Sequence, residues 1–308
     1  MDSARAVAGS VASPERLALR DAGARGFQPS DRRALPTVGR TARLELTFER
    51  RGARTVLTRS YAEPPIRVGP AIDIDGAAYF IVVCAGPGIF GGDDLRQSIH
   101  VGRGARVVLT SQSALQVHPA PHALTATSHQ DYRIDEDGEL HAEWDPVIPF
   151  TAARFDQRIT LDAAEGARLH WSDALMAGRA GRGEAWQFAA LGHELVARVG
   201  GSLAYLERYR LARDRGPTRT WIAGGAQYIG TTLVVHSGAT AAAAAGLHST
   251  LGIPAPGGTT AGVDCVQEGV VLARLLSSSG GSFAAARAAV RRFALESIFG
   301  RPATSKRK

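Results

Sequence analysis

The dominant pattern along the chain is the alternation of apolar and polar residues that is typical of half-buried β-strands. Leu44, Leu46 and Phe48 fall on one face of a first run, which ends at a glycine turn around Gly52. The octamer at 51–58, RGARTVLT, is nearly repeated at 103–110 as RGARVVLT. We interpret this repeated pattern as a unit of strand, glycine turn and strand.

The same unit recurs at 132–144 and 159–171, and in a looser form at 195–206. Four turn glycines are separated by 34, 28 and 35 residues: Gly104, Gly138, Gly166 and Gly201. Quasi-periodic units of this kind are typical of stacked coils, in which each coil buries the apolar face of its neighbour. We therefore predict a mostly β fold with a coiled, β-helix-like stacking of strand hairpins. The alternative is a β-sandwich, which also shows strand–turn–strand units at regular spacing.

Helices are expected to be few. The clearest one is predicted at 282–299, where Phe283, Val290 and Phe293 recur at helical spacing before Gly300-Arg301-Pro302 ends the pattern. Two brief helices are also predicted, at 111–117 and 172–176. The glycine- and alanine-rich stretch at 216–281 gives little further indication.

The chain is expected to divide into three parts. Residues 1–38 lack sustained periodicity and are predicted to be a disordered extension. Residues 39–300 are predicted to form a single mainly-β domain that ends in a helix, and residues 301–308 a basic tail. There is no secretory signal pattern and no apolar run of membrane-spanning length, so a cytoplasmic location is the default expectation.

Composition excludes several classes of function. Lysine occurs only at Lys306 and Lys308, so 36 − 2 = 34 basic residues are arginine, and a P-loop or a Schiff-base lysine is excluded. The two cysteines, Cys84 and Cys265, form no CxxC pair, which argues against a disulfide framework or a thiolate zinc site. Arginines are spread along the chain and aromatic residues make up 6%, so a nucleic-acid interface is not expected. The net charge of +7 favours acidic protein partners.

The most particular motif is the glycine-rich turn GPGIFGGDDL at 86–95, followed by the hydroxyl-rich strand end TSQSA at 110–114. Further marks follow the same order: PPIRV at 64–68, DPVIPF at 145–150, and Gly178-Arg179 with Gly183-Glu184. In this order the set resembles the UreD (UreH) family of urease accessory proteins. The resemblance runs from about Arg43 to Leu211, and more weakly to the C-terminal helix. It departs at Gln116, where the family usually has lysine, and in a shorter segment before Pro146.

The resemblance implies a largely β, coiled fold and a protein that is not an enzyme. It also implies docking on the urease structural subunits and, through a UreF-type accessory protein, recruitment of a UreG-type nickel GTPase. A homodimeric assembly within that complex is expected, without nucleic-acid or membrane partners. No cofactor is expected to be permanently bound. Nickel would be in transit through an internal tunnel lined by polar and acidic groups.

By the same resemblance, Asp93, Asp145 and Glu184 are candidates to line or gate the nickel route. His118 and His122, which lie in a proline-rich loop, are weaker candidates for a nickel-docking site. Carboxylate oxygen is a modest ligand for nickel and imidazole a better one, and weak ligation suits an ion that must leave again. Each candidate also has a plainer interpretation. Asp93 could accept backbone N–H groups in a turn, nearby arginines could neutralise Glu184, and the histidine loop could simply be solvated.

Two other hypotheses remain open. Glu143 and Asp145 flank Trp144 and would share one face of a strand, so they could form a catalytic carboxylate pair. Other hydrolase signatures, such as GxSxG, HExxH or a cysteine–histidine pair, are missing from the sequence. The second hypothesis is a pure docking scaffold that never contacts the metal.

Overall fold

The structure is a computed structural model that describes residues 39–120, 122–212, 225–252 and 258–302, all within one compact unit. The predicted N-terminal extension and residues 303–308 of the predicted tail lie outside these described residues. The predicted division of the chain into domains therefore stays a prediction. Within the described residues the fold is mostly β, as expected.

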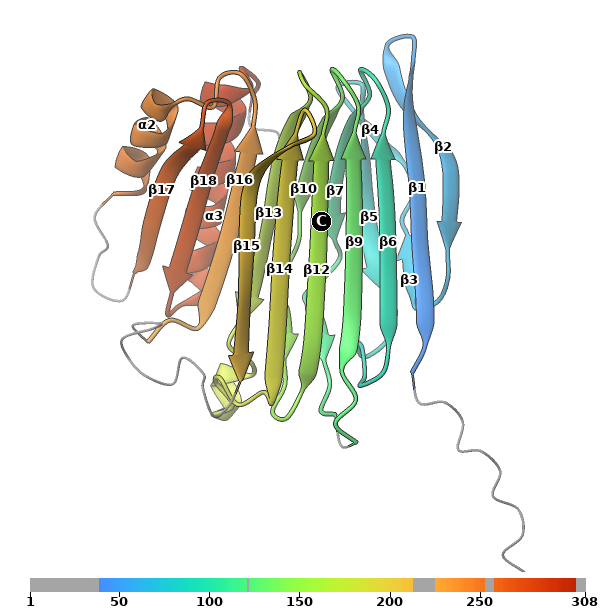
Figure 1. The fold of residues 1–308 in the computed structure, drawn as a ribbon, viewed down its shortest axis with the longest axis vertical. Coiled ribbons are helices and arrows are strands. Elements are labelled where there is room, and N and C mark those ends of the chain that lie inside the picture. The colour runs from blue at the N-terminus through green and yellow to red at the C-terminus, as the bar shows by residue number, and fades with distance from the viewer. Residues whose placement is uncertain (1–38, 121, 213–224, 253–257, 303–308) are drawn as a thin grey trace, which may run out of the picture. The chain divides into compact units, whose positions relative to one another are not determined.

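Two sheets stand face to face (Figure 1). Sheet A has seven strands, in the spatial order β15 (Ser202–Ala212), β14 (Ala190–Val199), β12 (Arg154–Ala163), β9 (Ala126–Ile134), β6 (Asp94–Val101), β1 (Thr41–Arg51) and β2 (Arg54–Ala62). Sheet B has eleven. Its main path is β17 (Thr259–Gln267), β18 (Val270–Ser277), β16 (Tyr228–Val235), β13 (Arg168–Met176), β10 (Glu139–Glu143), β7 (Arg106–Ser111), β5 (Ala77–Cys84) and β3 (Ile66–Val68). Three short strands join it off this path: β4 (Ile72–Ile74), β8 (Leu115–Val117) and β11 (Val147–Pro149).

The chain passes from sheet A to sheet B and back, so that β6, β9 and β12 of sheet A alternate with β7, β10 and β13 of sheet B. Neighbouring central strands within a sheet are parallel: Asp94 aligns with Thr127, 33 residues later, and Ala163 with Ile134, 29 residues earlier. Each passage through both sheets is thus one coil of a β-solenoid. The coil lengths follow the spacing of the turn glycines, and the parallel register confirms the stacked arrangement rather than the β-sandwich.

The strand–turn–strand units are of two kinds. At the margins of sheet A, Gly52 and the pair Gly200-Gly201 join antiparallel neighbours, β1 with β2 and β14 with β15. Between them, the turns at Gly104, Gly138 and Gly166 carry the chain from one sheet to the other. These central units were predicted as hairpins, and in that detail the prediction is wrong. The local pattern is the same in both cases, and only the pairing of the second strand differs.

The inward faces of both sheets form one continuous core. Leu44, Leu46 and Phe48, the first alternating run in the sequence, are almost fully buried in it, and Trp171 of β13 is buried opposite Tyr132 of β9. The alternation in the sequence therefore identified the core face of the first strand correctly.

Two α-helices lie against the outer face of sheet B at its β16–β18 end (Figure 1). The predicted C-terminal helix is confirmed as α3 (Gly280–Phe293), which continues into a π-helical turn at Ala294–Ile298. The other helix, α2 (Ala241–Leu251), was not predicted, since its alanine-rich sequence has little amphipathic pattern. A 3₁₀ turn, Ala180–Arg182, completes the helical elements of the described residues. None of these helices has the length and apolarity needed to cross a membrane.

The two predicted brief helices are wrong. Residues 111–117 include the end of β7 and the short strand β8, and residues 172–176 are the last part of β13. Strand β13 is buried on both faces, between the sheets on one side and under α3 on the other. A strand of this kind reads as a nearly continuous buried run, so periodicity does not distinguish it from a helix.

Candidate functional site

A row of polar side chains crosses the interior between the sheets. On sheet A, strand register aligns four inward-facing residues on β9, β12, β14 and β15: Ser128, Gln157, His193 and Tyr209. On sheet B, register aligns three more on β13, β16 and β18: Asp173, Thr231 and Arg274. We call these seven residues the interior polar layer. It runs across successive coils of the solenoid rather than along any one strand.

Two adjoining cavities follow this layer. The first has a volume of about 100 Å³ and reaches from Cys84 and Asp145 to Gln157 and Asp173. The second has a volume of about 10 Å³, room for about one water molecule, and is lined by His193 together with Gln157 and Asp173. Because Gln157 and Asp173 line both cavities, the two hollows adjoin each other.

Asp173 is the buried acid of the layer. Burial raises the pKa of Asp173 to about 6, against the opposing pull of Arg287 and Arg274. The carboxyl therefore takes up a proton much closer to neutral pH than an exposed aspartate does. Within the described residues, no arginine, lysine or histidine lies within ion-pair distance of this carboxylate.

His193 is the buried base of the layer. Its ring stacks on Tyr209 with centroids 4.8 Å apart, and its Nε2 has no hydrogen-bond partner among the described residues. Burial lowers the pKa of His193 below its ordinary value, although Glu207 pulls it up. A neutral imidazole with an unused ring nitrogen can bind a metal ion without first losing a proton.

At the β15–β18 end, an ion pair borders the layer. Arg274 lies 2.8 Å from Glu207, which is buried, and donates a hydrogen bond to Thr231 Oγ1 at 3.2 Å. The Arg274 side chain is 38% exposed, so this end of the layer reaches the surface.

At the opposite end, Asp145 lines the first cavity. Its Oδ2 accepts a hydrogen bond from the Ser111 hydroxyl at 3.0 Å. The backbone N–H of Asp145 in turn donates to Ser111 Oγ at 2.8 Å. Ser111 and Asp145 are half-buried, and Ser113 beside them is exposed, so this end also reaches solvent. Among the residues predicted for the nickel route, Asp145 is the one that lines the cavity.

Asp93 is buried close by but does not line the cavity. Its carboxylate accepts hydrogen bonds from the Arg40 backbone N–H at 2.8 Å and from the Arg40 guanidinium and the Phe90 N–H, both at 3.0 Å. Burial pushes the pKa of Asp93 up, but these donors outweigh burial and hold it below its usual range. The carboxylate ties the start of β1 to the turn before β6.

Glu184 follows the 3₁₀ turn and forms a two-bond ion pair with Arg179, at 2.8 and 2.6 Å. Hydrogen bonding to Arg179 lowers the pKa of Glu184. The Arg179 guanidinium in turn stacks over Phe150, 4.1 Å from the ring centroid. Glu184 lines neither cavity of the interior layer.

The two loop histidines lie apart from the layer. His118 is bonded through Nε2 to the Pro87 carbonyl at 2.7 Å and stacks on Phe90, with centroids 4.4 Å apart. His122 lies in an exposed turn. Among the described residues, no cluster of three or more histidine, cysteine, aspartate or glutamate side chains could hold a metal ion.

The predicted carboxylate pair does not share one face. Strand β10 ends at Glu143, which pairs with Arg291 of α3 at 3.1 Å on the outer side of sheet B. Asp145 lies beyond the strand end and lines the cavity between the sheets. The i, i+2 argument fails because the strand stops between the two residues, so this basis for a catalytic pair is removed.

Asp173 and His193 were not singled out from the sequence, although a signal was present. Each interrupts an inward-facing row of apolar residues: Asp173 lies between Trp171 and Leu175, and His193 between Leu191 and Leu195. A polar residue at a core position of a strand is costly unless it has a partner or a role. That these two lie in adjoining coils could not be read from the sequence.

Comparison with known proteins agrees with the resemblance described above. A family model described as "UreD urease accessory protein" matches residues 40–308. "Urease accessory protein UreD" of Sorangium cellulosum is 33% identical over 178 residues, covering 58% of this chain and 56% of the relative. "Urease accessory protein UreD 2" of Streptomyces griseus is 31% identical over 179 residues, covering 56% and 60%.

"Urease accessory protein UreD" of Ralstonia nicotianae is 34% identical over 232 residues, covering 74% of this chain and 77% of the relative. The chain spans less than two thirds of the length of the Sorangium and Streptomyces relatives. The description as an accessory protein agrees with the prediction of a non-enzymatic role. The family model matches most of the chain, and the chain therefore belongs to the UreD urease accessory protein family.

Proposed function

We propose that this protein is a non-enzymatic urease maturation factor that helps deliver nickel to the urease active site. In this proposal it binds the urease structural subunits in the cytoplasm and receives nickel through UreF- and UreG-type partners, within a homodimeric assembly. Family membership supports the accessory role. The interior polar layer supports passage of the ion through the protein.

The observation that carries the proposal is the pair of buried groups at the centre of the layer. His193 offers an unused ring nitrogen, and Asp173 lines the same cavity without a cationic partner within ion-pair distance among the described residues. Leaving such groups buried in an apolar core costs stability. A function that uses them is therefore the physical reason to keep them.

Nickel is the cargo in this proposal. Imidazole nitrogen suits nickel, and carboxylate oxygen binds it more weakly. A route through Asp145, Asp173 and His193 would offer few protein ligands at each point, so the ion would be passed on rather than held. The Glu207–Arg274 ion pair then borders one end of the route, where partner docking could change its geometry. Asp93 and Glu184 stay predictions as gating residues.

The test is the nickel content of urease subunits co-produced with this chain and the other accessory proteins. Asp173→Asn keeps the shape of the side chain and removes its charge, so we expect urease with little nickel and little activity. Asp156→Asn is the matched control, because Asp156 lies on the outer face of sheet A in an exposed ion pair with Arg210. Co-purification of both variants with urease is recorded in parallel.

The second candidate is the pure docking scaffold. The ion pairs of Asp93 and Glu184 favour it, because both carboxylates already have structural partners. If Asp173→Asn and His193→Leu both assemble with urease and leave its nickel content unchanged, the route is refuted and the scaffold remains.

A further inference from the structure

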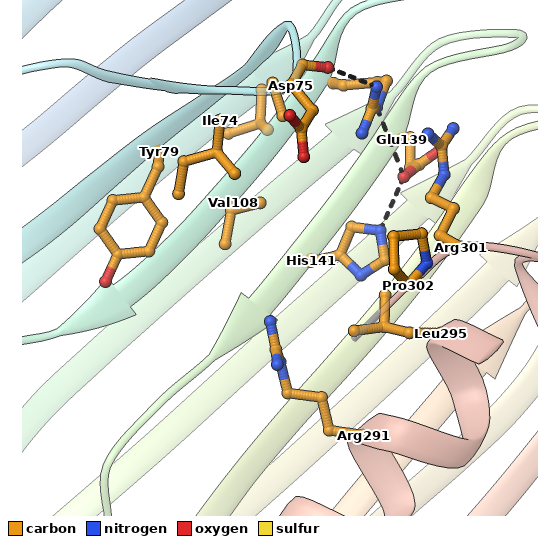
Figure 2. A pocket seen from close by; sticks show the side chains of 13 residues that line it. Ile74, Asp75, Tyr79, Val108, Glu139, His141, Arg291, Leu295, Arg301 and Pro302 are labelled. Atoms are coloured by element: carbon orange, nitrogen blue, oxygen red, sulfur yellow. Dashed lines mark hydrogen bonds and ion pairs between the residues drawn. The ribbon is translucent and has the colours of Figure 1, made fainter. Parts of the chain in front are cut away.

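A separate cavity lies on the outer face of sheet B, between that sheet and the C-terminal segment (Figure 2). Its volume is about 120 Å³, several times the space of one water molecule. Figure 2 shows Ile74 and Tyr79 on the strand side, with Leu295 and Pro302 of the C-terminal segment opposite. None of its lining residues belongs to the interior polar layer.

One end of this cavity is crowded with arginine. Glu139, almost fully buried, is approached by Arg301 at 2.7 Å, Arg168 at 3.5 Å and Arg106 at 3.8 Å. It also accepts a hydrogen bond from His141 at 2.8 Å. Although burial opposes ionisation, His141 and the arginines lower the pKa of Glu139 to about 2. This single carboxylate is shared among three guanidinium groups.

Charges around the cavity do not balance. Four arginines carry positive charge at or beside it: Arg106, Arg168, Arg291 and Arg301. Three carboxylates face them: Asp75, Glu139 and Glu143, the last paired with Arg291. One positive charge is left in excess when His141 is neutral.

Arg106 also has an unused donor. Its Nη1 donates to the Asp75 carbonyl at 2.9 Å, but its buried Nε has no hydrogen-bond partner among the described residues. The 3.8 Å between that nitrogen and Glu139 is beyond hydrogen-bond distance. A buried guanidinium donor without an acceptor is costly, and burial together with Arg301 accordingly lowers the pKa of Arg106.

We propose that this cavity binds a small monocarboxylate. The carboxylate would accept hydrogen bonds from Arg106 and Arg301, while its apolar part lies against Tyr79, Ile74 and Leu295. Guanidinium suits a planar carboxylate, and a single negative charge balances the excess. The apolar walls disfavour a phosphate, which would leave charged oxygens against hydrocarbon.

Binding would have a mechanical consequence. Leu295, Arg301 and Pro302 form one wall of the cavity and β5 with β7 the other, so an occupant would join the C-terminal segment to sheet B. A ligand that binds only the folded state raises its stability. Occupancy should therefore raise the unfolding temperature of the protein.

The experiment titrates the full chain with butyrate, its neutral analogue butyramide, and inorganic phosphate, at constant ionic strength, by calorimetry and thermal unfolding. We expect millimolar or tighter binding and a raised unfolding temperature with butyrate alone. A tripeptide with a free C-terminal carboxylate, compared with its amide, shows whether the carboxylate can come from a protein chain end. Failure of butyrate to bind, or equal binding of butyramide or phosphate, overturns the proposal.

Two variants localise the binding. Arg106→Met should weaken butyrate binding about ten- to a hundredfold, the loss expected for charge-assisted hydrogen bonds. The matched control is Arg103→Met, which removes an exposed arginine from the turn just before β7 and should not change affinity. Val108→Phe keeps every charge but fills the cavity, and should abolish binding even if Arg106→Met does not fold. Unchanged affinity in a folded Arg106→Met or Val108→Phe protein refutes the site.

Discussion

At the scale of single residues, Asp93 and Asp173 show how differently one residue type behaves in one fold. Both are buried. Asp93 accepts three hydrogen bonds, from Arg40 and Phe90, and its pKa lies below the usual range. For Asp173, burial outweighs the distant arginines, and its pKa is about 6. Asp93 therefore stabilises the fold in its charged form, whereas the charge of Asp173 opposes folding.

A pH dependence follows from this difference. Because the pKa of Asp173 is higher in the folded protein than its ordinary value of 3.8, ionisation removes stability as pH rises from about 4 to about 6. We expect Asp173→Asn to be more stable than wild type at pH 8. Its free energy of unfolding in urea should be higher by up to about 3 kcal/mol. The difference should shrink as pH falls through this range and vanish below it, where the wild-type carboxyl is protonated in both the folded and the unfolded state.

Asp131→Asn, on the exposed face of β9, is the control for that series and should show no such trend. A wild-type protein more stable than Asp173→Asn at pH 8 would contradict the argument. If Asp173→Asn is more stable than wild type and the urease matured with it contains less nickel, Asp173 is a residue retained for function at a cost in stability.

At the scale of elements, the C-terminal helix packs closely on sheet B because Gly230 has no side chain. Gly230 of β16 lies under the Phe283 ring of α3, and a Cβ at this glycine would come within 2.8 Å of that ring. Phe283 itself is buried and stacks on Tyr228 at 5.2 Å. The glycine therefore determines how closely α3 approaches sheet B.

Gly230→Ala should consequently destabilise the protein by about 1–3 kcal/mol in urea unfolding, the usual cost of overpacking. The matched control is Gly262→Ala, on β17 at the far side of β18 in the same sheet. A Cβ at Gly262 meets no atom within 4 Å, so this change should be neutral or slightly stabilising. Equal effects at both positions would show that the Gly230–Phe283 contact is not what positions the helix.

At the scale of the whole molecule, the interior polar layer exists because coils are stacked in register. Ser128, Gln157 and His193 lie on three successive parallel strands of sheet A and align through the ladder. A route across these coils has to remain open along its length. Blocking it at one coil should therefore stop passage without changing any charge.

Ser128→Phe places a large side chain in the first cavity, and we expect urease matured with this variant to contain little nickel. Its matched control, Ser98→Phe, adds the same ring to the exposed outer face of sheet A. Nickel content is measured on urease purified from cells that produce all accessory proteins. Full nickel loading with a folded Ser128→Phe variant would favour the docking scaffold over the route.

The sequence by itself determined the strand–turn–strand units between residues 44 and 206, the core face of β1, the C-terminal helix and the length of each coil, because alternation and turn glycines are local properties of the chain. Its motifs also led to the UreD family. It did not reveal α2, whose stability comes from packing on β17 and α3 more than from an amphipathic pattern.

Only the tertiary structure decided which strand–turn–strand units are hairpins and which cross between sheets. It also separated Glu143 from Asp145, since the strand end between them is set by contacts with α3 and β13. Above all, it brought Asp173 and His193 to one cavity. Their proximity depends on the register of strands from different coils, and that register is determined by packing between residues far apart in the chain.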